Sequence, residues 1–353
     1  MNPQGPSIGK TVAVYGAISA LSAIAGVAIL LTYDAYRHPI SWVSATQYLS
    51  GESLFVPDRE LGFIVRPNLN APSENPSRSY FTNDRSARVA AAGMATPARV
   101  DFITIGDSQT LGDGVASDDT FTGALARSTG LAGLNFGMSG YGSVGSLLLM
   151  RRVLDLKPKF VVYGFWEDHL NRNVRPCLES GMPFCTPRPV VAFDPLGPSI
   201  RLPDDPAAGL ARARLWYGHG GPPFIKDLTA AAARNWNALL GLLSASDAMG
   251  TVADSAKIEA AIFVLNQMKE SAEASGARLV VVWLPLYFTE INDAPSWLSA
   301  FCRDAGIALV DMGPRLREFR RDGTVIAIPG NGHITADVHR AIAREIANSL
   351  VTP

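Results

Sequence analysis

Apolar residues recur with two different periods along the chain from residue 99 to its end. Short runs rich in β-branched and aromatic residues predict strands, and longer stretches with apolar residues at helical spacing predict helices. The predicted strands are residues 100–105, 131–136, 160–165, 278–284 and 307–311, and the predicted helices are residues 119–129, 143–155, 256–274, 296–305 and 335–350. Such alternation indicates an α/β fold, in which a parallel sheet carries helices on both faces.

Two further segments complete the predicted organisation of the chain. Residues 34–97 hold short extended runs broken by Pro and Gly, which predicts a juxtamembrane collar packed on a main domain of residues 98–353. Residues 171–254 separate the third and fourth predicted strands; they begin Pro- and Gly-rich and become helical at 227–243. An insertion of this length at the carboxyl end of a sheet is typical of a lid or a substrate wall.

Residues 11–33 carry no charged side chain and follow a short tail of residues 1–10. A helix of this length spans roughly 35 Å, enough to cross a bilayer. A cleavable signal peptide is the alternative, because residues 25–28 are small, but the apolar run exceeds the roughly 7–15 residues of a typical signal core. We therefore expect a single transmembrane helix that anchors the protein.

Lys10 precedes this span and Arg37 follows it, so flanking charge does not decide the orientation. Cys177 and Cys185 lie close together in a Pro-rich loop and can form a disulfide in an oxidising compartment, with two unpaired surface thiols as the alternative. Cys302 lies in an apolar predicted helix and is expected to be a buried small hydrophobe. These features favour a single-pass protein of the bacterial inner membrane with its main domain in the periplasm.

Charge and motif content exclude several classes of function. The net charge is -1 and no Lys/Arg cluster is present, so there is no electrostatic footprint for nucleic acid. The segment from Gly106 to Gly112 lacks the Gly-Lys-Ser/Thr ending of a phosphate loop. Glu167, Asp168 and His169 are adjacent and point in different directions, so they do not predict a metal site, and Asp168 is expected to brace its loop. No metal or dissociable cofactor is expected.

Candidate chemistry lies where predicted strands end. The first strand stops at Gly106-Asp107-Ser108, which places a hydroxyl at the carboxyl edge of the sheet, where α/β folds hold their sites. A Gly-rich turn around Gly140 follows the second strand and exposes backbone N–H groups suited to an oxyanion hole. His333 lies in a turn before the last helix, from which it can serve Ser108 as a general base.

Two neighbouring polar residues receive structural assignments. Asp113, which follows the Ser108 turn, is expected to make local hydrogen bonds. His339, inside the last predicted helix, is expected to be a residue of the helix face without a catalytic role.

Four blocks of the chain, in order, resemble the SGNH (GDSL) hydrolase family over about residues 99–350. They are 106–108, 135–142, 164–173 and 329–340. The resemblance implies a flavodoxin-like three-layer α/β/α fold and esterase or acyl-transfer chemistry. Ser108 would attack an acyl carbon, His333 would act as base, and the N–H groups of Ser108 and Gly140 would hold the oxyanion. Collar residues 57–63 and 66–68 resemble membrane-anchored members associated with bacterial cell-surface polysaccharide O-acylation.

The chain departs from the family pattern at two places. The orienting carboxylate is expected two or three residues before His333, where Asn331 and Gly330 stand; an Asn can hold an imidazole but cannot stabilise an imidazolium as a carboxylate does. The oxyanion Asn falls on Glu167, whose ionised side chain only accepts hydrogen bonds. Residues that could compensate are Asn171 or Asn173 for the amide, and Asp311, Asp322 or Glu167 for the carboxylate.

The sequence leaves three hypotheses. The first is a membrane-anchored serine esterase or O-acyl(acetyl)transferase that acts on an acylated cell-surface glycan or another small ester. The second, motivated by Asn331 and Glu167, is a catalytically impaired protein that binds glycan or a membrane-protein partner as a scaffold. The third is a lipid-directed esterase, which only the anchor suggests.

Overall fold

A computed structural model of the 353-residue chain describes residues 54–177, 186–209, 252–285, 290–330 and 332–351, together with 15–16, 18–22, 24–26 and 28–29. The chain divides into two compact units, and the larger comprises Ser53–Ser180, Phe184–Ala213 and Asp247–Pro353. The predicted membrane span, residues 11–33, belongs to the smaller unit and is described only in part, as helix. Within the described residues, no helix has both the length and the apolarity needed to cross a bilayer.

An eight-stranded sheet forms the centre of the larger unit, with the strand order β12-β11-β8-β6-β7-β5-β4-β3. The strands are β3 (Asn70–Ala71), β4 (Tyr80–Thr82), β5 (Arg88–Val89), β6 (Phe102–Gly106), β7 (Gly133–Gly137), β8 (Phe160–Trp166), β11 (Arg278–Leu284) and β12 (Ala308–Asp311). From β7 to β12 all neighbouring strands are parallel. Numbered along the chain, these five strands have the order 2-1-3-4-5 of flavodoxin-like folds, whose ligands bind beside the first and third strands.

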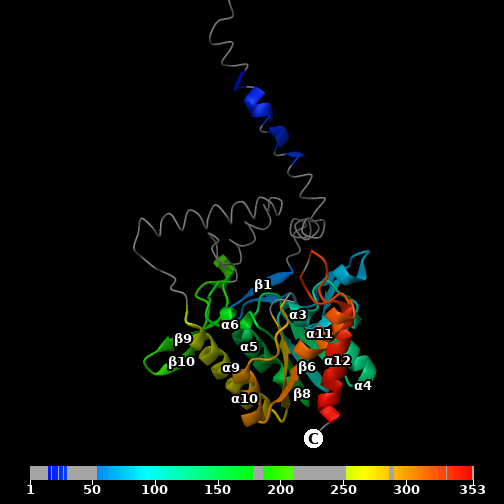
Figure 1. The fold of residues 1–353 in the computed structure, drawn as a ribbon, viewed down its shortest axis with the longest axis vertical. Helices are drawn as coiled ribbons and strands as arrows, with labels where there is room; N and C mark the ends of the chain where they lie inside the picture. Colours follow the sequence, from blue (N-terminus) through cyan, green and yellow to red (C-terminus); the bar gives the residue numbers. More distant parts are fainter. Residues whose placement is uncertain are drawn as a thin grey trace, which may run out of the picture. The chain divides into compact units, whose positions relative to one another are not determined.

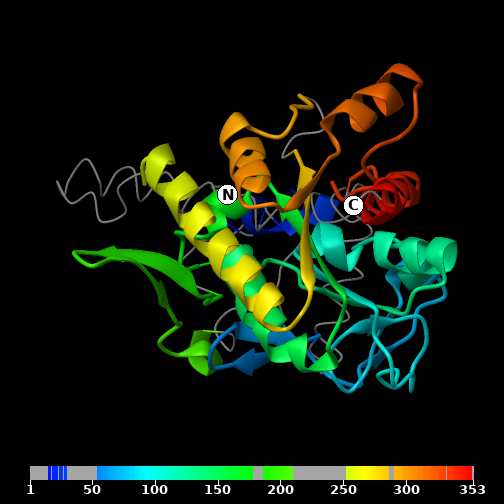
Figure 2. The ribbon, with the colours of Figure 1, turned by 90° about the horizontal axis from the view of Figure 1, so that it is seen from below.

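Helices cover both faces of the sheet (Figures 1 and 2). Side chains of β6 alternate between two buried clusters: Ile103 and Ile105 pack with α5, α9 and α10, whereas Phe102 packs with α4, α11 and α12. The helices are α4 (Phe121–Thr129), α5 (Ser143–Val153), α9 (Asp254–Ala274), α10 (Ser296–Asp304), α11 (Gly313–Arg321) and α12 (Ala336–Val351). Because a strand directs successive side chains to opposite faces, this alternation produces the three-layer α/β/α arrangement.

The described part of the collar, from residue 54 to residue 97, belongs to the same larger unit. Strands β3, β4 and β5 extend the sheet in antiparallel fashion beyond β7, where Arg88 pairs with Asn135. A separate hairpin, β1 (Phe55–Asp58) and β2 (Gly62–Val65), buries Phe63 against Tyr141. The collar therefore contributes side chains close to the carboxyl edge of the parallel strands.

The ten predicted strands and helices all occur, with ends displaced by at most two residues. Elements that were not predicted include the single-turn helices α3 (Ser108–Leu111) and α6 (His169–Arg172), the helix α11, and a hairpin of β9 (Val190–Asp194) and β10 (Gly197–Arg201) inside the insertion. Helix α11 has only three buried positions among many charged residues, so too few apolar residues mark it in the sequence. The helical stretch predicted at 227–243 lies outside the described residues.

Candidate active site

Ser108 begins the short helix α3 directly after β6 ends. Gly106 makes this turn possible: its φ is +150°, and a Cβ at this position would lie 2.2 Å from Thr110 Oγ1 and 2.8 Å from the carbonyl oxygen of Gly164. Asp107 caps the helix by accepting a hydrogen bond from the N–H of Gln109 at 3.0 Å. Ser108 is thereby held at the carboxyl edge of the sheet with 8% of its surface exposed.

Gln109 connects the Ser108 turn to the segment that contains His333. Its Oε1 accepts a hydrogen bond from the N–H of Ile334 at 3.0 Å, and its Nε2 donates to the carbonyl of Gly332 at 3.5 Å. The side chain is almost fully buried, at 2% exposure, so water does not compete for these contacts. One amide therefore spans the backbone on both sides of His333 and joins two sequence blocks that lie 225 positions apart.

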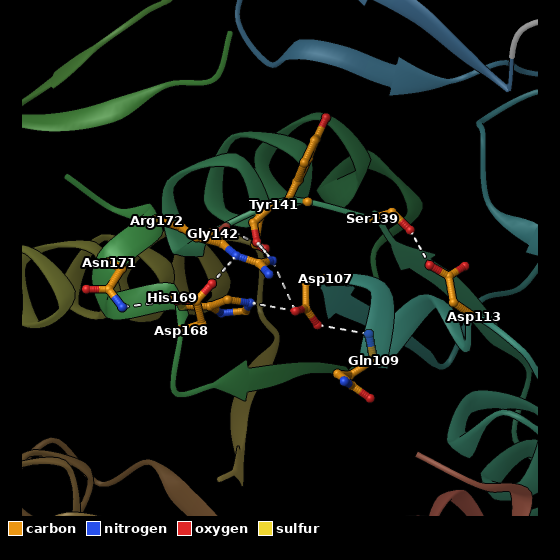
Figure 3. Close-up of polar contacts among 12 residues, drawn as sticks. Asp107, Gln109, Asp113, Ser139, Tyr141, Gly142, Asp168, His169, Asn171 and Arg172 are labelled. Atoms are coloured by element: carbon orange, nitrogen blue, oxygen red, sulfur yellow. Dashed lines mark hydrogen bonds and ion pairs between the residues drawn. The ribbon is translucent and has the colours of Figure 1, made fainter. Parts of the chain in front are cut away.

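Asp113 faces His333; its backbone N–H makes a local hydrogen bond to the carbonyl of Ser108 at 3.1 Å, as predicted, whereas its side chain bonds to distant residues. Its Oδ2 accepts a hydrogen bond from Ser139 Oγ at 2.5 Å, and its Oδ1 accepts one from the Tyr80 hydroxyl (Figure 3 shows the Ser139 contact). His333 Nε2 lies 3.8 Å from Asp113 Oδ2. The prediction covered the backbone and missed the side-chain contacts, because the collar and the turn after β7 place donors beside the Asp113 carboxylate that lie 33 and 26 residues away.

The structure therefore places against His333 a carboxylate that was not among the predicted candidates. Asp311, one of those candidates, accepts hydrogen bonds from the N–H groups of Ala294 and Gly313, each at 2.9 Å. Asp322 lies at the exposed end of α11. Asn331 lies outside the described residues.

Gly140 lies in a turn with φ +83° after β7. Its carbonyl accepts a hydrogen bond from Arg188 at 3.2 Å, and the same guanidinium donates to the carbonyls of Arg175 and Cys177 at 2.8 and 2.7 Å. Within the described part of the chain, the N–H groups of Gly140 and Ser108 donate to no protein acceptor. This leaves both available to a ligand oxygen.

The amides considered as substitutes for the oxyanion Asn have other partners. Asn173 is fully buried and exchanges hydrogen bonds with Ser143, where it caps α5. Asn171 donates to Asp168 at 3.0 Å (Figure 3). Asp168 also accepts from Arg172, which confirms its predicted bracing role. Glu167 donates its backbone N–H to Leu284 at the end of β11.

A buried ionic cluster under the Ser108 turn was missed by the sequence reasoning (Figure 3). Asp107 Oδ2 lies 3.4 Å from Nε2 of His169, a residue of the one-turn helix α6 (His169–Arg172), and 3.2 Å from Arg172 Nη1. Burial opposes ionisation of Asp107, but these two neighbours hold its pKa below the usual value. The cluster therefore fixes the helix cap beside Ser108 in its charged form.

His169 continues this cluster into the protein interior. Its Nδ1 lies 2.7 Å from the Tyr163 hydroxyl, which hydrogen-bonds Ser143 at 2.7 Å. Burial lowers the pKa of His169. The i,i+4 spacing of Asp168 and Arg172 could have predicted a helical turn here. Nothing in the sequence, however, predicts that this turn contacts Asp107. Within the described residues, no group of three or more His, Cys, Asp or Glu is arranged to hold a metal ion.

The remaining histidine and cysteine assignments concern structure. His339 on α12 is fully buried, accepts the N–H of Phe121 at 3.1 Å, and has a pKa lowered to about 3 by burial. It thus lies on the inner face of the helix. Cys302 is buried, as predicted, and burial raises its pKa to about 12. Cys177 is disulfide-bonded, and Cys185 lies outside the described residues.

No protein-family model matches this chain, and no curated protein matches it. Solved structures similar to it include a protein assigned to the G-D-S-L lipolytic family from Desulfitobacterium hafniense, with 12% identity, a TM-score of 0.37, and coverage of 70% of this chain and 98% of that one. An acetyl-xylooligosaccharide esterase from Geobacillus Stearmophilus has 13% identity, a TM-score of 0.38, and coverage of 71% and 94%. An alpha/beta hydrolase from the metagenome of Lake Arreo, Spain, has 13% identity, a TM-score of 0.38, and coverage of 73% and 97%.

Proposed function

We propose that this protein is a serine esterase or O-acyltransferase of the SGNH (GDSL) type. The observation that carries the proposal is the Gln109 amide, which binds the backbone on both sides of His333 while its neighbour Ser108 begins a turn at the carboxyl edge of β6. A hydroxyl and an imidazole carried on two mutually bonded turns are the pair that nucleophilic acyl transfer requires.

The reaction follows from the roles that these groups can take. Ser108 Oγ attacks the acyl carbon while His333 accepts the hydroxyl proton, and the carbonyl oxygen becomes an oxyanion that the N–H groups of Ser108 and Gly140 receive. Collapse of this intermediate breaks the bond to the leaving alcohol, which takes the proton from His333. The acyl group, now on Ser108, passes to water in hydrolysis or to an acceptor hydroxyl in transfer: His333 removes the proton of the attacking oxygen and returns it to Ser108 Oγ as the bond between Ser108 and the acyl carbon breaks.

The substrate and the site of action belong to the same proposal. The uncharged run of residues 11–33 supports a membrane anchor, and the disulfide bond at Cys177 supports an oxidising compartment such as the bacterial periplasm. An enzyme fixed there would meet cell-surface polysaccharide, so we propose O-acyl groups of such a glycan, acetyl above all, as the substrate.

The test uses the full-length chain in mild detergent with p-nitrophenyl acetate as substrate and a fluorophosphonate as active-site probe. Wild-type protein is expected to release nitrophenol and to carry the phosphonate on Ser108, located by peptide mass spectrometry. Ser108→Ala should lose both, with turnover reduced by about 10³-fold or more. Ser128→Ala, which changes an exposed serine of α4, is the matched control and should behave as wild type. Equal turnover of p-nitrophenyl acetate by Ser108→Ala and by wild-type protein would refute the proposal.

A non-catalytic scaffold that binds glycan or a membrane protein is the second candidate. The observation in its favour is Glu167, an acceptor at the position where the family pattern expects an oxyanion-binding Asn. This candidate predicts that cells carrying Ser108→Ala have the same phenotype as cells with the wild-type gene. The esterase proposal predicts that they have the same phenotype as cells in which the gene is deleted.

A further inference from the structure

We propose that Asp113 is the positioning residue that supplies negative charge to His333 during acyl transfer, in place of the carboxylate that residues 330–331 do not provide. The inference rests on the proposed function. Its basis is the distance of 3.8 Å between Asp113 Oδ2 and His333 Nε2, with both side chains less than one quarter exposed.

Asp113 acts on His333 through charge, because 3.8 Å is too long for a hydrogen bond. Its hydrogen bonds come instead from Ser139 and Tyr80, one to each carboxylate oxygen. Burial raises the pKa of Tyr80 well above its usual value, so the phenol stays protonated and donates throughout the neutral range. The carboxylate is therefore held in place without help from His333, and its charge stabilises the imidazolium that forms when His333 takes the Ser108 proton.

Asp113 is also tied to the nucleophile. Its N–H donates to the carbonyl of Ser108 at 3.1 Å. The buried guanidinium of Arg88 donates to the carbonyls of Leu111, Gly112 and Val115, each at 2.7 Å, and so holds the chain on both sides of Asp113. The Asp113 carboxylate is therefore fixed relative to the Ser108 turn. Gln109 holds the His333 segment against that same turn through its hydrogen bonds to Gly332 and Ile334.

Other titratable and charged groups around this site carry less weight at neutral pH. His339, on α12 after the His333 turn, is neutral because burial lowers its pKa to about 3. Arg340 pairs with Asp337 at 2.5 Å and with Asp119 at 3.4 Å. Arg88 lies over the Tyr80 ring, 4.6 Å from its centroid, and its guanidinium is engaged by the carbonyls of Leu111, Gly112 and Val115. Glu167, which follows β8, is another carboxylate, and the experiment below compares the substitution Glu167→Gln with Asp113→Asn.

The deciding experiment separates kcat from KM for p-nitrophenyl acetate, measured on the full-length chain in detergent at neutral pH. Asp113→Asn should lower kcat by about ten- to a hundred-fold while KM changes by less than about threefold, because the neutral amide fills the same space but no longer stabilises the imidazolium. Tyr80→Phe keeps the charge, so it should lower kcat less than Asp113→Asn does. Asp118→Asn, an exposed carboxylate in the next turn, is the matched control and should leave kcat and KM unchanged.

The results separate this inference from the proposed function. A kcat that is unchanged in Asp113→Asn, or that falls in Glu167→Gln instead, would overturn the role of Asp113 while phosphonate labelling of Ser108 still upheld the esterase. A rate loss in Asp113→Asn that merely follows its unfolded fraction, measured by urea titration, would also overturn it. Absence of labelling at Ser108 in the wild-type protein would overturn both.

Discussion

Replacement of Gln109 by Leu tests whether the amide bridge is what brings Ser108 and His333 together. Leu retains most of the side-chain volume, so the change removes the polar contacts without leaving a large cavity. The N–H of Ile334 loses its acceptor at 3.0 Å in a position from which water is excluded, which costs about 1–3 kcal/mol of folding stability. The contact with the Gly332 carbonyl, at 3.5 Å, adds little to this figure.

The effect on catalysis should exceed the effect on folding. The His333 turn loses its tie to the serine turn, and a displacement of about 1 Å in a reacting group can cost about 100-fold in rate. We therefore expect kcat to fall by about 100-fold while KM changes by less than about threefold, since substrate binding is not the function of this side chain. Initial rates with p-nitrophenyl acetate give the kinetic constants, and urea unfolding followed by tryptophan fluorescence gives the stability.

A matched control is the same substitution at Gln267, a half-buried residue of α9 whose side chain makes exposed hydrogen bonds with Arg151 and Glu270. It should change stability by less than about 0.5 kcal/mol and leave the rate unchanged. The reasoning is refuted if Gln109→Leu unfolds more easily but keeps the wild-type kcat per folded molecule, because His333 would then reach Ser108 without the bridge.

Three further changes test the surrounding structure. Burial lowers the pKa of His339 to about 3, so below about pH 6.5 the unfolded chain binds a proton at this residue that the folded chain does not. The free energy of unfolding should therefore decrease as the pH falls, by about 1.4 kcal/mol per pH unit, or about 2.7 kcal/mol in total at pH 4.5. His339→Asn, which keeps an acceptor for the N–H of Phe121, should remove that part of the pH dependence in urea unfolding; an unchanged slope contradicts the assignment. Gly106→Ala forces a Cβ to within 2.8 Å of the Gly164 carbonyl and should cost about 3 kcal/mol or more, measured as a lowered Tm; a Tm equal to wild type would mean that the turn relaxes freely. Arg88→Met removes the guanidinium from three buried carbonyls, of which Gly112 keeps the Val115 N–H at 3.1 Å and Leu111 keeps the Asn135 amide at 3.4 Å, while Val115 loses its donor. The change should cost about 3 kcal/mol in urea unfolding, with little recovery in Arg88→Lys because an ammonium lacks the guanidinium fork.

The local pattern of side chains was sufficient to locate the elements of the sheet. A strand buried on both faces is predicted by the apolar residues Phe102, Ile103 and Ile105, and Gly106 marks where this strand ends. These are properties of a few consecutive residues, because backbone period and turn chemistry depend on near neighbours along the chain. The position of Ser108 at the carboxyl edge followed from them, as did the place of His333 before the last helix.

Only the tertiary structure decided which polar groups surround Ser108 and His333. Tyr80 and Ser139 reach Asp113 because β4 and β5 join the sheet beyond β7, a pairing that no local period encodes. His169 reaches Asp107 because β6 and β8 are neighbours in space, although β7 lies between them in the chain. A side chain's partners depend on strand order and register, which the fold fixes through its whole buried core. For that reason the sequence determined where the serine lies, and the structure determined which carboxylate faces its histidine.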